Sequence, residues 1–162
     1  MTDRPGPIGA LFAEYRRALD EYLSLIEKLG PIVYEMELDT NQEEAEMNTI
    51  KGILMHTLMA GYGYANAFRR KWDIPQTSPK KYFPEYAEVT SAMNAMFEYS
   101  EATFEGRWGM KDEEMTATNI PLRWSDHHDI EALLEHAVMH IHRHRRQIEK
   151  LVKRAVGTPV TT

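Results

Sequence analysis

Histidines are the residues whose number and spacing in this sequence point most directly to chemistry. Seven are present, and four of them, His136, His140, His142 and His144, fall within nine residues. At about 100° per residue, His144 lies within the apolar stripe of the helix predicted here and His140 lies on its flank. Imidazoles four residues apart on a helix reach a common point, which favours metal binding with little rotamer strain. His140 and His144 are therefore the best pair of candidate ligands.

The two neighbouring histidines differ from this pair in direction. His142 points almost directly away from the apolar stripe, toward solvent, whereas His136 lies near its edge and is a supporting or substitute ligand. The pair alone is equally well explained by partly buried histidines that bind no metal. A third donor from another helix is needed to favour a metal site.

His56 is the candidate for this third donor, because it is the only other histidine inside a predicted helix core. It shares its side of the helix with small residues, Gly52, Ala60, Gly63 and Ala67. Small residues let a neighbouring helix approach closely, so the imidazole could reach a shared ion. Without the pair at 140 and 144, a core histidine bonded to a backbone carbonyl would be the better interpretation.

Three neutral imidazoles leave at least one coordination position of a metal ion for water or substrate, as in catalytic rather than structural sites. A metal held in this way lowers the pKa of bound water or activates a thiol. The predicted chemistry is therefore hydrolysis or thiol transfer. Imidazole accepts zinc, nickel, copper and iron alike, so the ligand set predicts one divalent ion without naming it.

Composition narrows the class of protein further. The 162 residues carry a formal net charge of -6 and no cysteine. The charge disfavours nucleic acid as a partner, and the lack of thiols leaves His, Asp and Glu as the strong ligands. The length predicts a single domain over residues 1–162. No apolar run of 18 residues and no signal peptide is seen, so we expect no membrane partner and a cytoplasmic location.

Apolar spacing of three and four residues, with breaks at Gly and Pro, predicts four long helices. We expect them over residues 8–29, 41–72, 84–104 and 128–155. Thr40 and Glu43 fit a capping box for the second helix, and Ser125 with Asp126 can cap the fourth. Residues 107–124 are predicted to form a long ordered loop, with room for a short strand, that covers one end of the bundle.

With His56 and the string from His140 to Ile148 in view, the chain resembles the DinB/YfiT-like superfamily of metalloenzymes. The resemblance implies an all-α four-helix bundle of up-down-down-up order, with metal ligands at His56, His140 and His144. It also implies zinc or nickel as the ion, and a homodimer. Arg145, Arg146 and Gln147 stand where the family usually has Arg-Gly-Gln, which indicates a distinct subgroup.

The resemblance implies a metal-dependent enzyme of the thiol S-transferase or hydrolase type. Characterised relatives use mycothiol or bacillithiol, so the expected substrate is a small molecule such as a low-molecular-weight thiol. The alternative is a non-catalytic metal-binding or stress-related interaction protein. No residue is assigned a catalytic role beyond the three ligands, although Tyr62, Tyr64 and Trp124 are expected near a pocket beside the metal.

The basic run at residues 142–146 allows two interpretations. Its guanidinium groups could bind an anion, such as the carboxylate of a thiol. The favoured interpretation is a solvated face whose cations pair with Glu135 and Glu149 at helical spacing.

Overall fold

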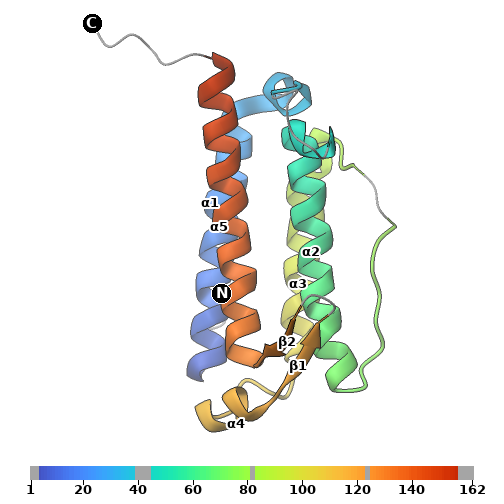
Figure 1. The fold of residues 1–162 in the computed structure, drawn as a ribbon, viewed down its shortest axis with the longest axis vertical. Helices are drawn as coiled ribbons and strands as arrows, with labels where there is room; N and C mark the ends of the chain where they lie inside the picture. Colours follow the sequence, from blue (N-terminus) through green and yellow to red (C-terminus); the bar gives the residue numbers. More distant parts are fainter. Residues whose placement is uncertain (1–3, 39–44, 81–82, 123–124, 157–162) are drawn as a thin grey trace, which may run out of the picture.

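The computed structural model describes residues 4–38, 45–80, 83–122 and 125–156 of the chain. Almost all of the regular structure is helical, which confirms the predicted all-α class. The long helices lie side by side along the longest axis (Figure 1), and they are α1 (Gly6–Glu35), α2 (Ile50–Lys71), α3 (Val89–Thr103) and α5 (Ile130–Val156). No helix in the described ranges combines the length and apolar character needed to cross a lipid bilayer.

The predicted end of the first helix is a break rather than an end. Gly30 has φ 74° and ψ 173°, which interrupts the helix after residue 29, as expected. Helical turns then resume at Pro31, because proline suits a first turn where its missing N–H is not needed. The resumed segment is fixed by Tyr34, a fully buried residue whose hydroxyl donates to the carbonyl of Pro84 at 2.8 Å.

The second helix begins later than predicted. A short 3₁₀ turn spans Ala45–Asn48, and α2 starts at Ile50 instead of residue 41. Thr49 is the cap, because its extended backbone lets the hydroxyl accept a hydrogen bond from the N–H of Gly52 at 2.9 Å. The capping box expected at Thr40 lies outside the described residues.

The other two helices also begin later than predicted. Glu85 and Glu88 form a capping box around the 3₁₀ turn Tyr86–Glu88, so α3 begins at Val89 instead of residue 84. Ser125 and Asp126, the predicted caps of the last helix, belong to strand β2 (Ser125–His128). Asp129 caps α5 instead, since its Oδ1 accepts a hydrogen bond from the N–H of Ala132 at 2.8 Å.

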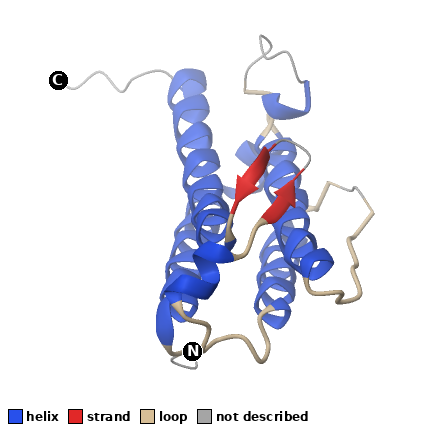
Figure 2. Ribbon diagram, turned by 60° about the horizontal axis from the view of Figure 1, so that its bottom comes forward, coloured by secondary structure: helices blue, strands red, loops and turns tan. Residues whose placement is uncertain are grey.

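The predicted loop at residues 107–124 contains a short helix and a strand. The helix is α4 (Asp112–Ala117), and β1 (Ile120–Leu122) pairs with β2 as an antiparallel hairpin. The hairpin lies against the sides of α2 and α5, toward one end of the long helices (Figure 2). Strand β1 packs on α2, whereas β2 and α4 pack on α5. This segment therefore covers one end of the helices, as expected.

Helix α2 has neighbours on several sides. It contacts α1, α3, α5 and β1. Its side toward α3 is tightly packed: a Cβ added at Gly61 would lie 2.3 Å from the sulfur of Met96, which is fully buried. Two residues further on, Gly63 is exposed, and a Cβ there would meet nothing within 4 Å.

These two glycines predict opposite effects of the same substitution. Gly61→Ala should lower the free energy of unfolding by about 1–3 kcal/mol, because the buried Met96 must move to admit a methyl group. Gly63→Ala should raise it by about 0.5–1 kcal/mol through helix propensity. Urea unfolding of both variants measures the difference. Equal effects at the two positions would contradict this packing of α2 against α3.

Candidate metal centre

Three histidines from two helices meet between α2 and α5. His56 comes from the first half of α2, and His140 and His144 come from successive turns of α5. The Nε2 atom of His140 lies 3.3 Å from that of His56 and 3.2 Å from that of His144. One ring nitrogen of each residue lies within 4.8 Å of the other two. The fold thus brings together all three residues that the sequence predicted as ligands.

These distances fit a common metal ion. Imidazole nitrogens bind Zn²⁺ at about 2.0–2.1 Å, so two of them at a tetrahedral angle lie about 3.3 Å apart. The two measured Nε2 separations, 3.3 and 3.2 Å, match this value. Neighbouring carboxylates do not add to the group: among the described residues, the potential ligands that cluster here are the three histidines.

Gln147 fixes the orientation of one ligand. Its Oε1 lies 2.9 Å from Nδ1 of His144, and an amide oxygen can only accept, so Nδ1 carries the proton. The lone pair of the ring is then on Nε2, which lies 3.2 Å from Nε2 of His140. Sequence analysis gave Gln147 no role beyond its place in a family motif. Its position three residues after His144 could have predicted this contact, since residues at that spacing are neighbours on the surface of a helix.

The electrostatic surroundings keep the ligands neutral. Burial lowers the pKa of His140 to about 3, with further contributions from the neighbouring His144 and His56. Burial also lowers the pKa of His144 to about 4, although the hydrogen bond to Gln147 opposes this shift. Both imidazoles are therefore unprotonated at neutral pH, which is the form that binds a metal ion.

Tyr64 and His136 flank the three ligands without joining them. The ring of Tyr64 meets His136 and His140 edge-on, with centroids 5.3 and 5.6 Å apart. His136 lies 6.1 Å from His140 by ring centroids, and its ring is outside the cluster of ligand nitrogens. Burial raises the pKa of Tyr64 to about 12, so its phenol is a hydrogen-bond donor at neutral pH.

A pocket of about 750 Å³ opens beside the ligands. Its lining comes from α2, α5 and β1, and comprises His56, Ala60, Gly63, Tyr64, Arg70, Pro121, Leu122 and His140. The small residues Ala60 and Gly63 therefore border a pocket, and the close helix approach that we expected along this stripe is wrong at these two positions.

The expected aromatic lining is partly confirmed. Tyr64 lines the pocket. Tyr62 instead packs against Tyr99 of α3, with ring centroids 5.1 Å apart, because it lies on a different side of α2. Trp124 lies outside the described residues.

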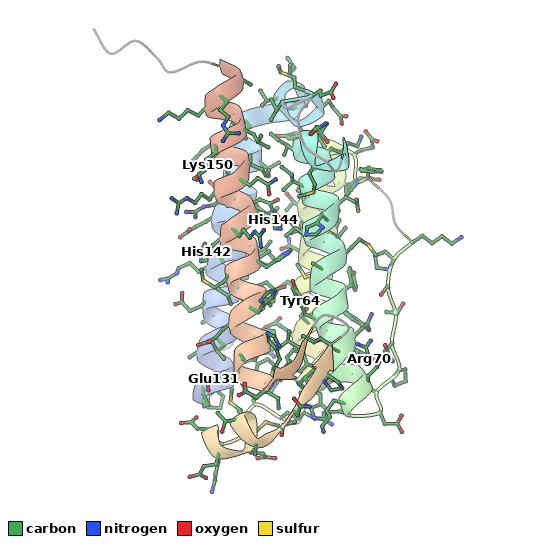
Figure 3. All side chains as sticks on the ribbon, in the orientation of Figure 1. Tyr64, Arg70, Glu131, His142, His144 and Lys150 are labelled. Atoms are coloured by element: carbon green, nitrogen blue, oxygen red, sulfur yellow. The ribbon has the colours of Figure 1, made fainter. Side chains whose placement is uncertain are left out.

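The basic run divides into paired and unpaired members. Arg145 forms ion pairs with Glu21 of α1 and with Glu149, the second at 3.5 Å, which confirms the predicted pairing with Glu149. Within the described ranges, neither Arg143 nor Glu135 forms an ion pair. His142 is partly buried and, together with Arg143, lines a separate groove on the outer side of α5 (Figure 3).

The lowered pKa values predict how acid affects the metal-free protein. Free histidine has a pKa of about 6.5, so on acidification the unfolded chain binds protons at these positions before the folded chain does. Stability should therefore fall as the pH drops from about 7 to 5, and His140→Gln should make this fall shallower. Thermal melts with a chelator present test the prediction, with His142→Gln as the control outside the cluster. The same slope in wild type and His140→Gln would contradict it.

Comparison with known proteins agrees with this site. The sequence pattern that defines the DinB family matches residues 3–162. Searches of curated proteins and of solved structures found no similar protein. Since the family match spans nearly the whole chain, the protein belongs to the DinB family.

Proposed function

We propose that the protein is a metal-dependent enzyme of the thiol S-transferase or hydrolase type, with one zinc or nickel ion held by His56, His140 and His144. The observation that carries the proposal is the meeting of three histidines, in which Nε2 of His140 lies 3.3 and 3.2 Å from Nε2 of His56 and of His144, separations that suit a tetrahedral ion. Membership of the DinB family is consistent with it. The proposed substrate is a small molecule, with a low-molecular-weight thiol as one reactant.

The pocket beside the ligands favours a catalytic role over a structural one. Structural metal sites are closed by four protein ligands, whereas this cluster has three within the described part of the chain and borders a space of about 750 Å³. A ligand that approaches through this space meets His56 and His140 directly, because both line it. A non-catalytic metal-binding or interaction protein, the alternative, has no need of such an opening.

A divalent ion in this position supplies Lewis acidity toward a thiol or a water molecule. The residues of the chain bind and orient the reactants. Gln147 holds His144 in the tautomer that presents Nε2. Tyr64 presents a protonated phenol toward the pocket, and Pro121 and Leu122 of the hairpin cover it with apolar surface that displaces water.

We also propose the up-down-down-up helix order of the family. The long connection from Trp72 to Glu85 runs back along the molecule in Figure 1, which supports parallel directions for α2 and α3. In Figure 1 the chain colours show that α1 and α5 both run from the bottom of the view to the top, which supports parallel directions for the first and last helices. The homodimer and the cytoplasmic location stay predictions from the sequence.

The metal site predicts a coupled loss of binding and activity. Wild-type protein, purified without a metal-binding tag, should contain about one divalent ion per chain. The double variant His140→Ala/His144→Ala should lose the ion and any transfer of a low-molecular-weight thiol to an aryl halide. Elemental analysis and a thiol-consumption assay measure the two quantities.

The chain offers a matched control for this experiment. His136→Ala/His142→Ala removes two histidines from the same helix and should keep the ion. Metal at 100 times its dissociation constant should stabilise wild type and control by about 2.7 kcal/mol and leave the ligand variant unchanged. Full metal content in the ligand variant would refute the site. Bound metal with no turnover of any thiol would favour the non-catalytic alternative.

Gln147 should matter for metal affinity without being a ligand. Replacing an outer hydrogen-bond partner of a metal-bound histidine typically weakens binding about 10- to 100-fold. Gln147→Leu should do so, because it leaves Nδ1 of His144 without its acceptor. Gln147→Glu keeps an acceptor oxygen and should retain most of the affinity. Competition with a chelating dye measures the constants, and equal affinity in wild type and Gln147→Leu would rule out the orienting role.

A further inference from the structure

The pocket beside the ligands is much longer than a metal site requires. Its lining follows α2 from His56 to Arg70, which are 14 residues and therefore about 21 Å apart along the helix axis. In Figure 3, His144, Tyr64 and Arg70 follow one another along the length of the molecule. A substrate that fills this space is elongated, with one end at the ligands and the other at Arg70.

Among the described residues, Arg70 is the one arginine or lysine in the lining of this pocket, and no carboxylate lines it. Its side chain is exposed and donates to Oε1 of Gln76 at 3.2 Å, and among the described residues no acidic side chain forms an ion pair with it. The guanidinium therefore has further N–H donors and a full positive charge to offer a ligand.

The preceding arginine shows what a structural role looks like in this helix. Arg69 donates to Oγ1 of Thr103 at 2.8 Å and to the carbonyl of Pro75 at 2.9 Å. It also lies over the ring of Tyr99, 3.9 Å from the centroid. Its hydrogen-bond donors and its charge are used within the fold, whereas Arg70 lines the pocket and has one hydrogen bond, to Gln76.

The space between the two ends is apolar on most sides. Ala60 and Gly63 of α2 face Pro121 and Leu122 of β1 across it. Tyr64 is the one polar side chain along this stretch among the described residues, and its hydroxyl makes no hydrogen bond to another of them. An uncharged middle segment with at most one hydrogen-bond acceptor suits these walls.

We propose that this pocket binds an elongated anionic substrate, with its metal-binding group at His56 and His140 and a carboxylate or phosphate paired with Arg70. The inference rests on the proposed metal site and adds the substrate class to it. Guanidinium groups pair with carboxylate and phosphate oxygens through forked hydrogen bonds. The net charge of -6 repels anions overall, so a local cation is needed to hold one.

The test measures binding of thiol probes to protein loaded with Co²⁺, which imidazole ligands accept. The probes are 11-mercaptoundecanoic acid, 11-mercaptoundecyl phosphate, 11-mercaptoundecanol and the short 3-mercaptopropionic acid. Titration of the thiolate-to-cobalt charge-transfer absorption gives a dissociation constant for each. The long probes share one chain and differ only in the end group, so their ratio isolates the contribution of charge.

We expect each long anion to bind about tenfold more tightly than the long alcohol, since a charge-assisted pair contributes on this scale. The better of the two identifies the anionic group. Arg70→Gln should reduce the preference to about one, whereas Lys71→Gln removes a neighbouring exposed charge outside the pocket lining and should keep it. An unchanged preference in Arg70→Gln would overturn the proposal.

Gly63→Leu tests the course of the pocket. A leucine side chain there enters open space. It should therefore weaken the binding of the long probes at least tenfold and leave the binding of 3-mercaptopropionic acid unchanged. Equal binding of long probes to this variant and to wild type would also overturn the inference. Cobalt content and thermal melts of each variant verify that the fold and the metal site are intact.

The short probe separates the two hypotheses. Binding of 3-mercaptopropionic acid without any preference among the long probes refutes the anionic substrate and leaves the metal site standing. Failure to take up cobalt, or absence of the absorption band with every thiol, refutes the proposed metal function and with it this inference.

Discussion

The approach of α2 to α5 is the contact on which the site depends. His140 and His144 are neighbours on α5 whatever the packing of the helices. His56 reaches them only because α2 and α5 pack side by side. Helix α2 is held in place by contacts on its other sides, with α1, α3 and β1. The same burial that stabilises the helix therefore fixes His56 at hydrogen-bonding distance from His140.

Burial also determines the chemical state of the ligands. An imidazole removed from water is less stable when charged, which lowers the pKa of His140 to about 3 and of His144 to about 4. His140 and His144 are therefore neutral rings that can share a cation. Polar rings that are buried, like His144, or half-buried, like His56 and His140, are costly unless they have partners. Gln147 supplies one such partner, and the mutual Nε2 contacts supply others.

Helix α2 has one tightly packed side and one open side. Gly61 admits the sulfur of Met96 from α3, where even a methyl group would collide, whereas Gly63 faces empty space in the pocket. The pocket persists because its outer wall is the hairpin, and Pro121 and Leu122 stand across from the small residues. Glycine thus suits these two positions of one helix for different physical reasons. The first permits close packing, and the second leaves room for a ligand.

The sequence by itself determined the all-α class and the pair His140 and His144, since a spacing of four places two side chains on one helical face in any fold. It also marked His56 as a buried histidine, but its meeting with the pair was decided by helix packing. Helix starts were misplaced because several polar residues compete as caps, and in the structure Thr49 and Asp129 make the capping hydrogen bonds. The pocket and Arg70 were beyond sequence analysis, because strand β1, some 50 residues further along the chain, forms the opposite wall.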